Sequence, residues 1–185
     1  MTPLPRSPIS VSPTEAVSAL IIHAHPVPDS LNRALFIAAQ EGLTAGDDRP
    51  AAASLCDGDD PTSADLADVD TLAFVYPTWW GGPPSILLDW VGRRLGPWID
   101  STPTEPSPLT SVRDLVAITT HGSPRMLNVL TGEPGRRLFG RSVRGLCAPD
   151  CRWHWLAYYG IDAENAETRT AFVSGLPDQL RSIHH

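Results

Sequence analysis

The stretch Thr71-Leu-Ala-Phe-Val-Tyr-Pro-Thr-Trp-Trp-Gly-Gly-Pro-Pro84 decides the fold. It begins with a continuous apolar run, which is typical of a strand covered on both faces, as in a parallel sheet. A turn rich in tryptophan and glycine follows. Pro83 or Pro84 suits the first turn of a helix, where a missing N–H is harmless. The stretch therefore predicts a buried strand, an unusual loop and a helix, in that order.

The same unit recurs along the chain. Further strands are predicted at Ala16–Ala24, Ala51–Cys56, Val112–Thr120 and Trp153–Tyr159. Three further helices are predicted: one from Leu31 with Asp29 or Ser30 as N-cap, one from Pro134 to Cys147, and one from a cap at Asp162 towards Leu180. The acidic segment Asp57–Asp68 stands where a helix is expected after the second strand, and Gly175 and Pro177 interrupt the last helix. This alternation predicts an α/β fold, a doubly wound five-stranded parallel sheet with strand order 2-1-3-4-5.

One domain is expected to account for most of the chain. Its 185 residues and hydrophobic fraction of 42% are ordinary for a globular domain. Residues 1–15 are rich in proline and serine and predict a flexible N-terminal tail, so the domain is expected to span residues 16–183. Proline, serine and threonine also crowd Pro97–Thr110, which predicts a long surface loop.

Charge and composition exclude several classes of function. The formal net charge of −7 makes the chain a poor nucleic-acid binder. We expect no membrane insertion, because no apolar run reaches spanning length. Cys147 and Cys151 have no second Cys or His pair at ligand spacing, so no metal site is expected. Three cysteines form no disulfide framework and fit a cytoplasmic protein.

The topology predicts where a ligand binds. In an open parallel sheet, ligands bind beyond the carboxyl ends of the strands, where the strand order reverses. That point lies between the first and third strands, at the loops His25–Asn32 and Pro77–Pro83, with Thr119–Pro124 beside them. These loops are also the most unusual stretches in composition, so topology and composition indicate the same site.

The first two loops suggest a phosphate and a planar ring. Ser30 and Asn32 lie at a predicted helix N-terminus, where free N–H groups and the helix dipole favour an anion; the alternative is that Ser30 only caps the helix. Trp79 and Trp80 offer a flat apolar wall, and Gly81 lets the backbone approach a ligand. The alternative is that Trp79 and Trp80 pack into the core or an interface, as one of two adjacent aromatic residues is expected to do.

The third loop supplies hydroxyl groups and one imidazole. His121 is the candidate catalytic residue, since an imidazole can hydrogen-bond a ring oxygen or donate a proton. The alternative is a surface histidine without a special role.

Three groups of residues carry a resemblance to a known family. They are Ile22-His-Ala-His-Pro26 with Ser30-Leu-Asn32, Phe74-Val-Tyr-Pro-Thr-Trp-Trp-Gly81 with Pro84-Ser-Ile-Leu-Leu-Asp-Trp90, and Ile118-Thr-Thr-His-Gly122. Together they resemble the flavodoxin-like NAD(P)H dehydrogenase (quinone) family, which includes DT-diaphorase and bacterial quinone reductases. The resemblance covers about Ala16 to Tyr159.

The resemblance implies a flavodoxin-like fold and a flavin enzyme. Such a protein binds FMN or FAD and passes hydride from NAD(P)H, its co-substrate, to a quinone or a similar small-molecule acceptor. It works as a homodimer, for which Trp90, Trp98 and the pair Trp153 and Trp155 offer apolar surface. The implied flavin-binding residues are His25, Ser30, Leu31 and Asn32 at the phosphate, Pro77, Thr78, Trp79, Trp80 and Gly81 at the ring, and Thr119, Thr120, His121 and Gly122 at its pyrimidine side.

The sequence also departs from the family. The larger members carry a tyrosine and then a histidine after the third loop, but Leu127 stands at the first position and Thr131–Pro134 contains no histidine. His121 replaces a glycine of the family pattern. These departures leave a second hypothesis open, a non-reductase on the same scaffold, such as an electron-transfer flavodoxin or a protein whose redox role is lost or changed.

Overall fold

The fold is built on a single parallel sheet. The computed structural model describes residues 19–44, 49–100, 104–163 and 165–184. The strands are β1 (Ala19–His23), β2 (Ala51–Ser54), β3 (Thr71–Thr78), β4 (Asp114–His121) and β5 (Arg152–Tyr159). They lie in the order β2-β1-β3-β4-β5 and all pair in parallel, so the predicted sheet and strand order are confirmed. The flexible tail predicted for residues 1–15 lies outside the described residues.

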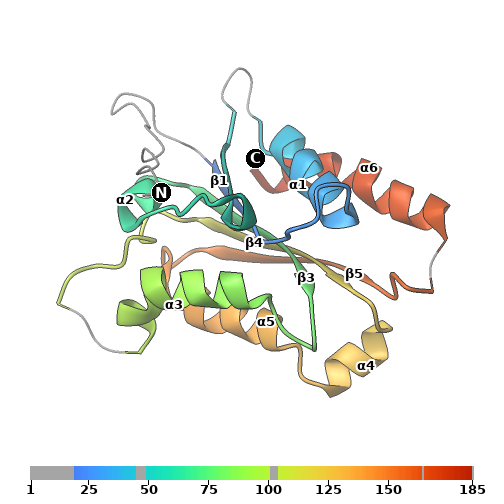
Figure 1. Cartoon of the computed structure of the whole chain (residues 1–185). Coiled ribbons are helices and arrows are strands. Elements are labelled where there is room, and N and C mark those ends of the chain that lie inside the picture. Colours follow the sequence, from blue (N-terminus) through green and yellow to red (C-terminus); the bar gives the residue numbers. More distant parts are fainter. Residues whose placement is uncertain (1–18, 45–48, 101–103, 164, 185) are drawn as a thin grey trace, which may run out of the picture.

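Helices cover both faces of this sheet, as Figure 1 shows. One face carries α1 (Leu31–Gly42) and α6 (Ala166–His184), and the other carries α3 (Ser85–Ile99) and α5 (Pro134–Arg137). The shorter elements are η1 (Leu55–Asp57), α2 (Ser63–Leu66), α4 (Arg125–Leu130), the π-helical turn η2 (Leu138–Val143) and η3 (Arg144–Leu146). The chain thus forms three layers, helix, sheet and helix.

The continuous apolar runs of the central strands are explained by burial on both faces. Successive side chains of a strand point to opposite faces. In β1, Leu20 and Ile22 join the core beneath α3, whereas Ala19 and Ile21 join the core beneath α1 and α6. Trp90 of α3 is fully buried, and its indole Nε1 donates to the Pro61 carbonyl at 3.1 Å.

Several predicted boundaries were wrong. The last helix begins at Ala166, capped by Asn165, whose Oδ1 accepts from Thr168 N at 2.9 Å, and not by Asp162. It continues through Pro177, because the lost hydrogen bond is offset by burial of its neighbours Leu176 and Leu180.

Other elements are shorter or longer than the sequence indicated. Pro97 lies inside α3, so the predicted surface loop begins only after Ile99. The second strand ends at Ser54 and is followed by a single 3₁₀ turn. The helix expected after this strand is present only as the four-residue α2. The helix predicted from Pro134 to Cys147 is divided among α5, η2 and η3. Among the described helices, none is both long and apolar enough to cross a lipid bilayer.

The contact between α1 and α6 yields a stability prediction. A Cβ atom on Gly42 would lie 2.8 Å from Pro177 Cα and from Leu180 Cβ, so the two helices pack this closely only with glycine. Gly42→Val is expected to lower the free energy of unfolding by about 1–3 kcal/mol, the usual cost of overpacking, measured by urea denaturation. Gly92→Val is the matched control, because a Cβ on this glycine of α3 would have no atom within 4 Å. Equal effects of the two variants would contradict this packing.

Candidate functional site

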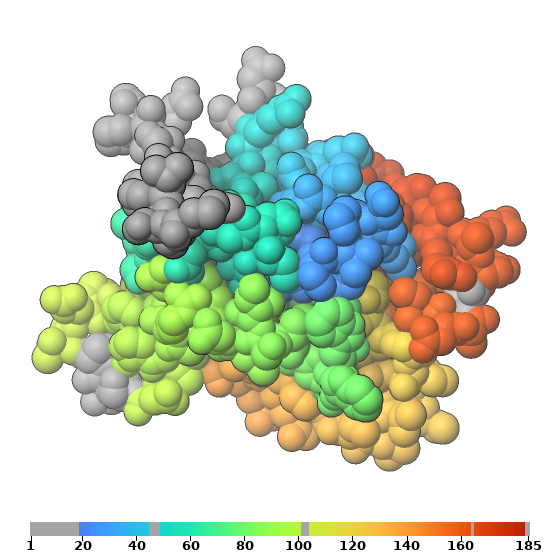
Figure 2. Space-filling view, in the orientation of Figure 1, coloured from blue at the N-terminus to red at the C-terminus, as the bar shows by residue number. Residues whose placement is uncertain are grey.

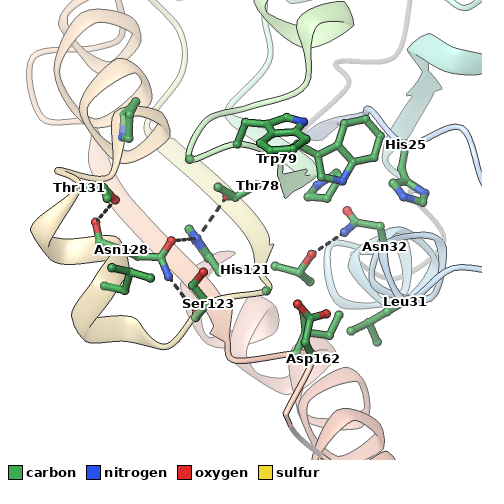
Figure 3. Close-up of a pocket in the computed structure, with 18 of the residues that line it drawn as sticks. His25, Leu31, Asn32, Thr78, Trp79, His121, Ser123, Asn128, Thr131 and Asp162 are labelled. Atoms are coloured by element: carbon green, nitrogen blue, oxygen red, sulfur yellow. Dashed lines mark hydrogen bonds between the residues drawn. The ribbon is translucent and has the colours of Figure 1, made fainter.

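A cleft of about 880 Å³ opens at the carboxyl edge of the sheet. Figure 3 shows residues of all three predicted loops around it. The predicted site residues that line it are His25, Ser30, Leu31, Asn32, Pro77, Thr78, Trp79, Trp80, Gly81, Thr120, His121 and Gly122. Thr119 does not line it: this residue is fully buried, and its hydroxyl lies 3.0 Å from the Thr78 hydroxyl, which it supports from below.

The first loop brings the N-terminus of α1 to the cleft. Ser30 does cap the helix, since its hydroxyl accepts from Arg33 N at 3.1 Å. The same hydroxyl lies 2.9 Å from His25 Nδ1 and lines the cleft, so capping is not its only contact. The first N–H groups of a helix have no partner within it and favour an anion.

Asn32 presents a buried acceptor to the cleft. Its Nδ2 donates to Thr120 Oγ1 at 2.9 Å, which joins the first loop to the third. Its Oδ1 is buried and has no hydrogen-bond partner. Since buried polar atoms are nearly always paired, this oxygen indicates a ligand that donates an N–H or O–H group.

The second loop is a two-residue hairpin that exposes both tryptophans. Trp79 N donates to Gly82 O at 2.8 Å and Gly82 N to Trp79 O at 2.9 Å. Trp80 (φ 52°) and Gly81 (φ 84°) take the left-handed conformations of a type I′ turn. Figure 2 shows this segment (green) at the surface between α1 (blue) and α4 (yellow).

Neither tryptophan packs into the core, so that part of the alternative was wrong, whereas packing at an interface stays a prediction. Trp80 is fully exposed and Trp79 is 43% exposed. A bulky residue in the left-handed region costs about 1–2 kcal/mol. Strained backbone of this kind is more typical of a ligand-binding site than of a segment that only packs against the core.

His121 is buried, so its interpretation as a surface residue was also wrong. Its ring stacks on Tyr159 with the centroids 4.5 Å apart. Nδ1 lies 2.9 Å from Asn128 Oδ1, and Nε2 lies 3.5 Å from the Thr78 hydroxyl. Figure 3 shows Asn128, His121 and Thr78 in this row.

Asn128 fixes the tautomer of His121. The Asn128 amide donates from Nδ2 to the carbonyls of Ser123 at 2.9 Å and Pro124 at 3.0 Å, so its oxygen faces the imidazole. The proton of the neutral ring therefore resides on Nδ1, which leaves Nε2 as an acceptor. Burial lowers the pKa of His121, and this outweighs the opposite effect of the Asn128 hydrogen bond. The ring is thus neutral at pH 7.

A second layer of residues holds the imidazole in place. Tyr159 donates from its hydroxyl to the Glu133 carboxylate and accepts from Trp155 Nε1 at 3.0 Å. Burial acts to raise the pKa of Glu133, but hydrogen bonds from Tyr159 and Arg136 outweigh it and keep this carboxyl ionised. No sequence pattern indicated this network, because its members lie on separate elements.

Other residues also line the cleft. They are Ser123, which belongs to the predicted third loop, and Leu127, Asn128, Thr131, Pro134, Ile161 and Asp162, which the predicted site did not include. Asp162 had a usable signal, because it follows the carboxyl end of β5 at the same edge of the sheet. A Cβ on Gly122 would lie 2.6 Å from Asp162 Oδ2, so a larger residue there would displace this carboxylate. Within the described residues, no group of His, Cys, Asp and Glu is placed to hold a metal ion.

The fold matches solved structures at low sequence identity. Smu.1420 from Streptococcus mutans UA159 has 19% identity and a TM-score of 0.70, with 89% of this chain and 98% of that chain covered. The NAD(P)H:quinone oxidoreductase from Methanothermobacter marburgensis has 17% identity and a TM-score of 0.68, with 92% and 98% covered. The FMN-dependent NADH-azoreductase from Bacillus anthracis str. Ames Ancestor, solved in complex with FMN, has 13% identity and a TM-score of 0.69, with 90% and 99% covered.

These matches establish a flavodoxin-like fold over nearly the whole chain. No family model matches the sequence, and no curated protein matches it either.

The contact between Asn128 and His121 gives a prediction about charge. Asn128→Asp places a carboxylate beside Nδ1 and is expected to raise the pKa of His121 above that in the unchanged protein, because an opposite charge favours the imidazolium. Asn128→Leu removes the acceptor and is expected to lower that pKa further. The measurement is an NMR titration of the His121 ring protons. The same titration curve in all three proteins would refute the assigned tautomer contact.

Proposed function

We propose that this chain is a flavin-dependent NAD(P)H oxidoreductase that passes hydride through bound FMN or FAD to a quinone or a similar small acceptor. The observation that carries the proposal is the cleft at the switch point between β1 and β3, where a helix N-terminus, an exposed tryptophan turn and an unpartnered buried acceptor meet. An isoalloxazine ring is planar and has one N–H group, which fits this combination. The quinone oxidoreductase and the azoreductase of the same fold support it by analogy.

Each loop is assigned one part of the flavin. His25, Ser30 and the first N–H groups of α1, at Leu31 and Asn32, hold the phosphate. The second loop lines the ring with Pro77, Thr78, Trp79, Trp80 and Gly81. The third loop closes the pyrimidine side of the ring with Thr120, His121 and Gly122. Thr119 supports Thr78 through the contact between their hydroxyl groups.

His121 is the proposed catalytic residue. When bound, a flavin supplies the hydride chemistry, and the protein positions the reactants and tunes the charge around them. The neutral imidazole presents Nε2 as an acceptor, so it can hold a proton at that atom. Asn128 and Tyr159 keep the ring in this orientation. Leu127 also lines the cleft, and it brings an apolar surface to the position where the family carries a tyrosine.

An absorption spectrum with added FMN or FAD, followed by anaerobic NADPH and a quinone, tests the proposal. The expected result is a bound flavin that bleaches with NADPH and recovers its colour with the quinone. Failure to bind either flavin would refute the proposal. Bound flavin without NADPH consumption would favour the second hypothesis, an electron carrier on the same scaffold.

The tryptophan turn makes a separate prediction. Trp79→Ala is expected to weaken FMN binding about 10-fold or more, since stacking of a planar ring on an aromatic side chain contributes about 1–3 kcal/mol. Trp98→Ala is the matched control, because Trp98 contacts Glu105 at the far end of α3. Fluorescence titration with FMN measures both. Unchanged affinity in the Trp79 variant would place the ring elsewhere.

We also propose that the protein is a cytoplasmic homodimer joined at α4. Four apolar side chains of this helix are 50–75% exposed: Met126, Leu127, Val129 and Leu130. The fully exposed Trp80 lines the same cleft as Leu127. Such a patch is uncommon on a monomer. Trp90 is fully buried and contributes nothing to this surface, contrary to the expectation from sequence. All three cysteines are free, which fits a reducing compartment.

Light scattering tests the dimer. The unchanged protein is expected at twice the mass of one chain, and Met126→Asp combined with Leu130→Asp is expected to produce monomers, because two carboxylates would be buried unpaired. Ile37→Asp is the control, since Ile37 is an apolar residue of α1 that is 50% exposed and lies outside this patch. A monomeric unchanged protein would refute this part of the proposal.

A further inference from the structure

A second cleft, which we call the arginine cleft, lies on the other side of the loop between α4 and α5 from the first cleft. It has a volume of about 340 Å³ and is lined by Val129, Gly132, Glu133, Arg136, Arg137, Gly140, Arg141 and Trp153. A third hollow of about 380 Å³ shares Gly140 and Arg141 with it and adds Arg144. The two hollows therefore adjoin along η2.

Positive charge is concentrated here in an otherwise acidic chain. The net charge of the chain is −7, yet Arg136, Arg137, Arg141 and Arg144 fall within nine residues, and no acidic residue lies between Glu133 and Asp150. Arg136 is paired with Glu133 at 3.1 Å. In the part of the chain that the structure describes, Arg137 and Arg141 form no ion pair. Their guanidinium groups remain available to an anion.

Two glycines shape the cleft around these side chains. A Cβ on Gly140 would lie 2.9 Å from Trp153 Nε1, so the helical backbone lies directly against the indole that forms the floor. A Cβ on Gly132 (φ 86°) would lie 2.9 Å from Arg137 Nη2, so this guanidinium rests on the loop between α4 and α5. The Arg137 side chain therefore lies beside this loop, and it is exposed.

That loop separates the two clefts. Thr131 and Pro134 line the first cleft, whereas Gly132 and Glu133, the residues between them, line the arginine cleft. A ligand that extends from the first cleft across this loop reaches Arg137. A pyridine nucleotide has this form, since its nicotinamide and its adenosine ribose lie at opposite ends of a flexible pyrophosphate link.

We infer that the arginine cleft binds the 2′-phosphate of NADPH and so selects NADPH over NADH. The inference rests on the proposed function. A planar guanidinium matches the geometry of a phosphate and forms short, charge-assisted hydrogen bonds with it. NADH carries a hydroxyl group at this position and gains nothing from the two unpaired arginines.

Steady-state kinetics of the flavin-loaded protein with each nucleotide test the inference. Arg137→Gln and Arg141→Gln are each expected to lower kcat/KM for NADPH about 10-fold or more, the usual effect of losing a hydrogen bond to a charged group, and to leave NADH within about twofold. Arg113→Gln is the matched control, because Arg113 is an exposed arginine beside the opposite end of β4. An equal effect on both nucleotides, or none on either, would overturn the inference.

Calorimetry with adenosine 2′,5′-bisphosphate and with AMP separates this inference from the proposed function. The bisphosphate is expected to bind more tightly than AMP, and the two variants are expected to remove the difference. This measurement needs no hydride transfer. A protein that shows the preference but oxidises neither nucleotide refutes the oxidoreductase proposal alone, whereas equal binding of both ligands refutes the inference even in an active reductase.

Discussion

The candidate site depends on the parallel register of β3 and β4. In that register Pro77 lies opposite Thr120 and Thr78 opposite His121, so both strands end at the same level. The Thr78 hydroxyl therefore meets both Thr119 and the His121 ring, and the tryptophan turn is positioned directly beyond them. A slip of one residue would turn every side chain of β3 to the other face, and burial of both faces prevents such a slip.

The buried state of His121 determines the chemistry that the cleft can support. Tyr159 and Asn128 hold the ring, and burial keeps it neutral, so the cleft offers acceptor atoms at His121 Nε2 and Asn32 Oδ1. Asp162 lines the cleft, and the other charge-bearing groups lie behind this layer, at Glu133 and the arginines of α5 and η2. The arrangement suits a neutral planar ring in the cleft and an anionic group at its margin.

Sequence patterns predict the sheet and the position of the cleft better than they predict the residues that support His121. The apolar runs of β3 and β4 predicted two buried parallel strands, because burial on both faces requires continuous apolar composition. The cleft was then predicted at the carboxyl ends of the strands, where the strand order reverses. Asn128 and Tyr159 could not be predicted, since their roles arise only when α4 and β5 fold against His121. Pro177 misled for the same reason: tertiary packing against Gly42 outweighs a local helix breaker.

The most direct test of the central claim is a crystal structure of the protein grown with FMN. The account predicts a flavin whose phosphate lies at the N-terminus of α1, beside Ser30, and whose ring lies between the Trp79 turn and His121, with a ring N–H donating to an acceptor of the cleft. A flavin bound at another surface, or a cleft that stays empty at saturating FMN, would contradict the account.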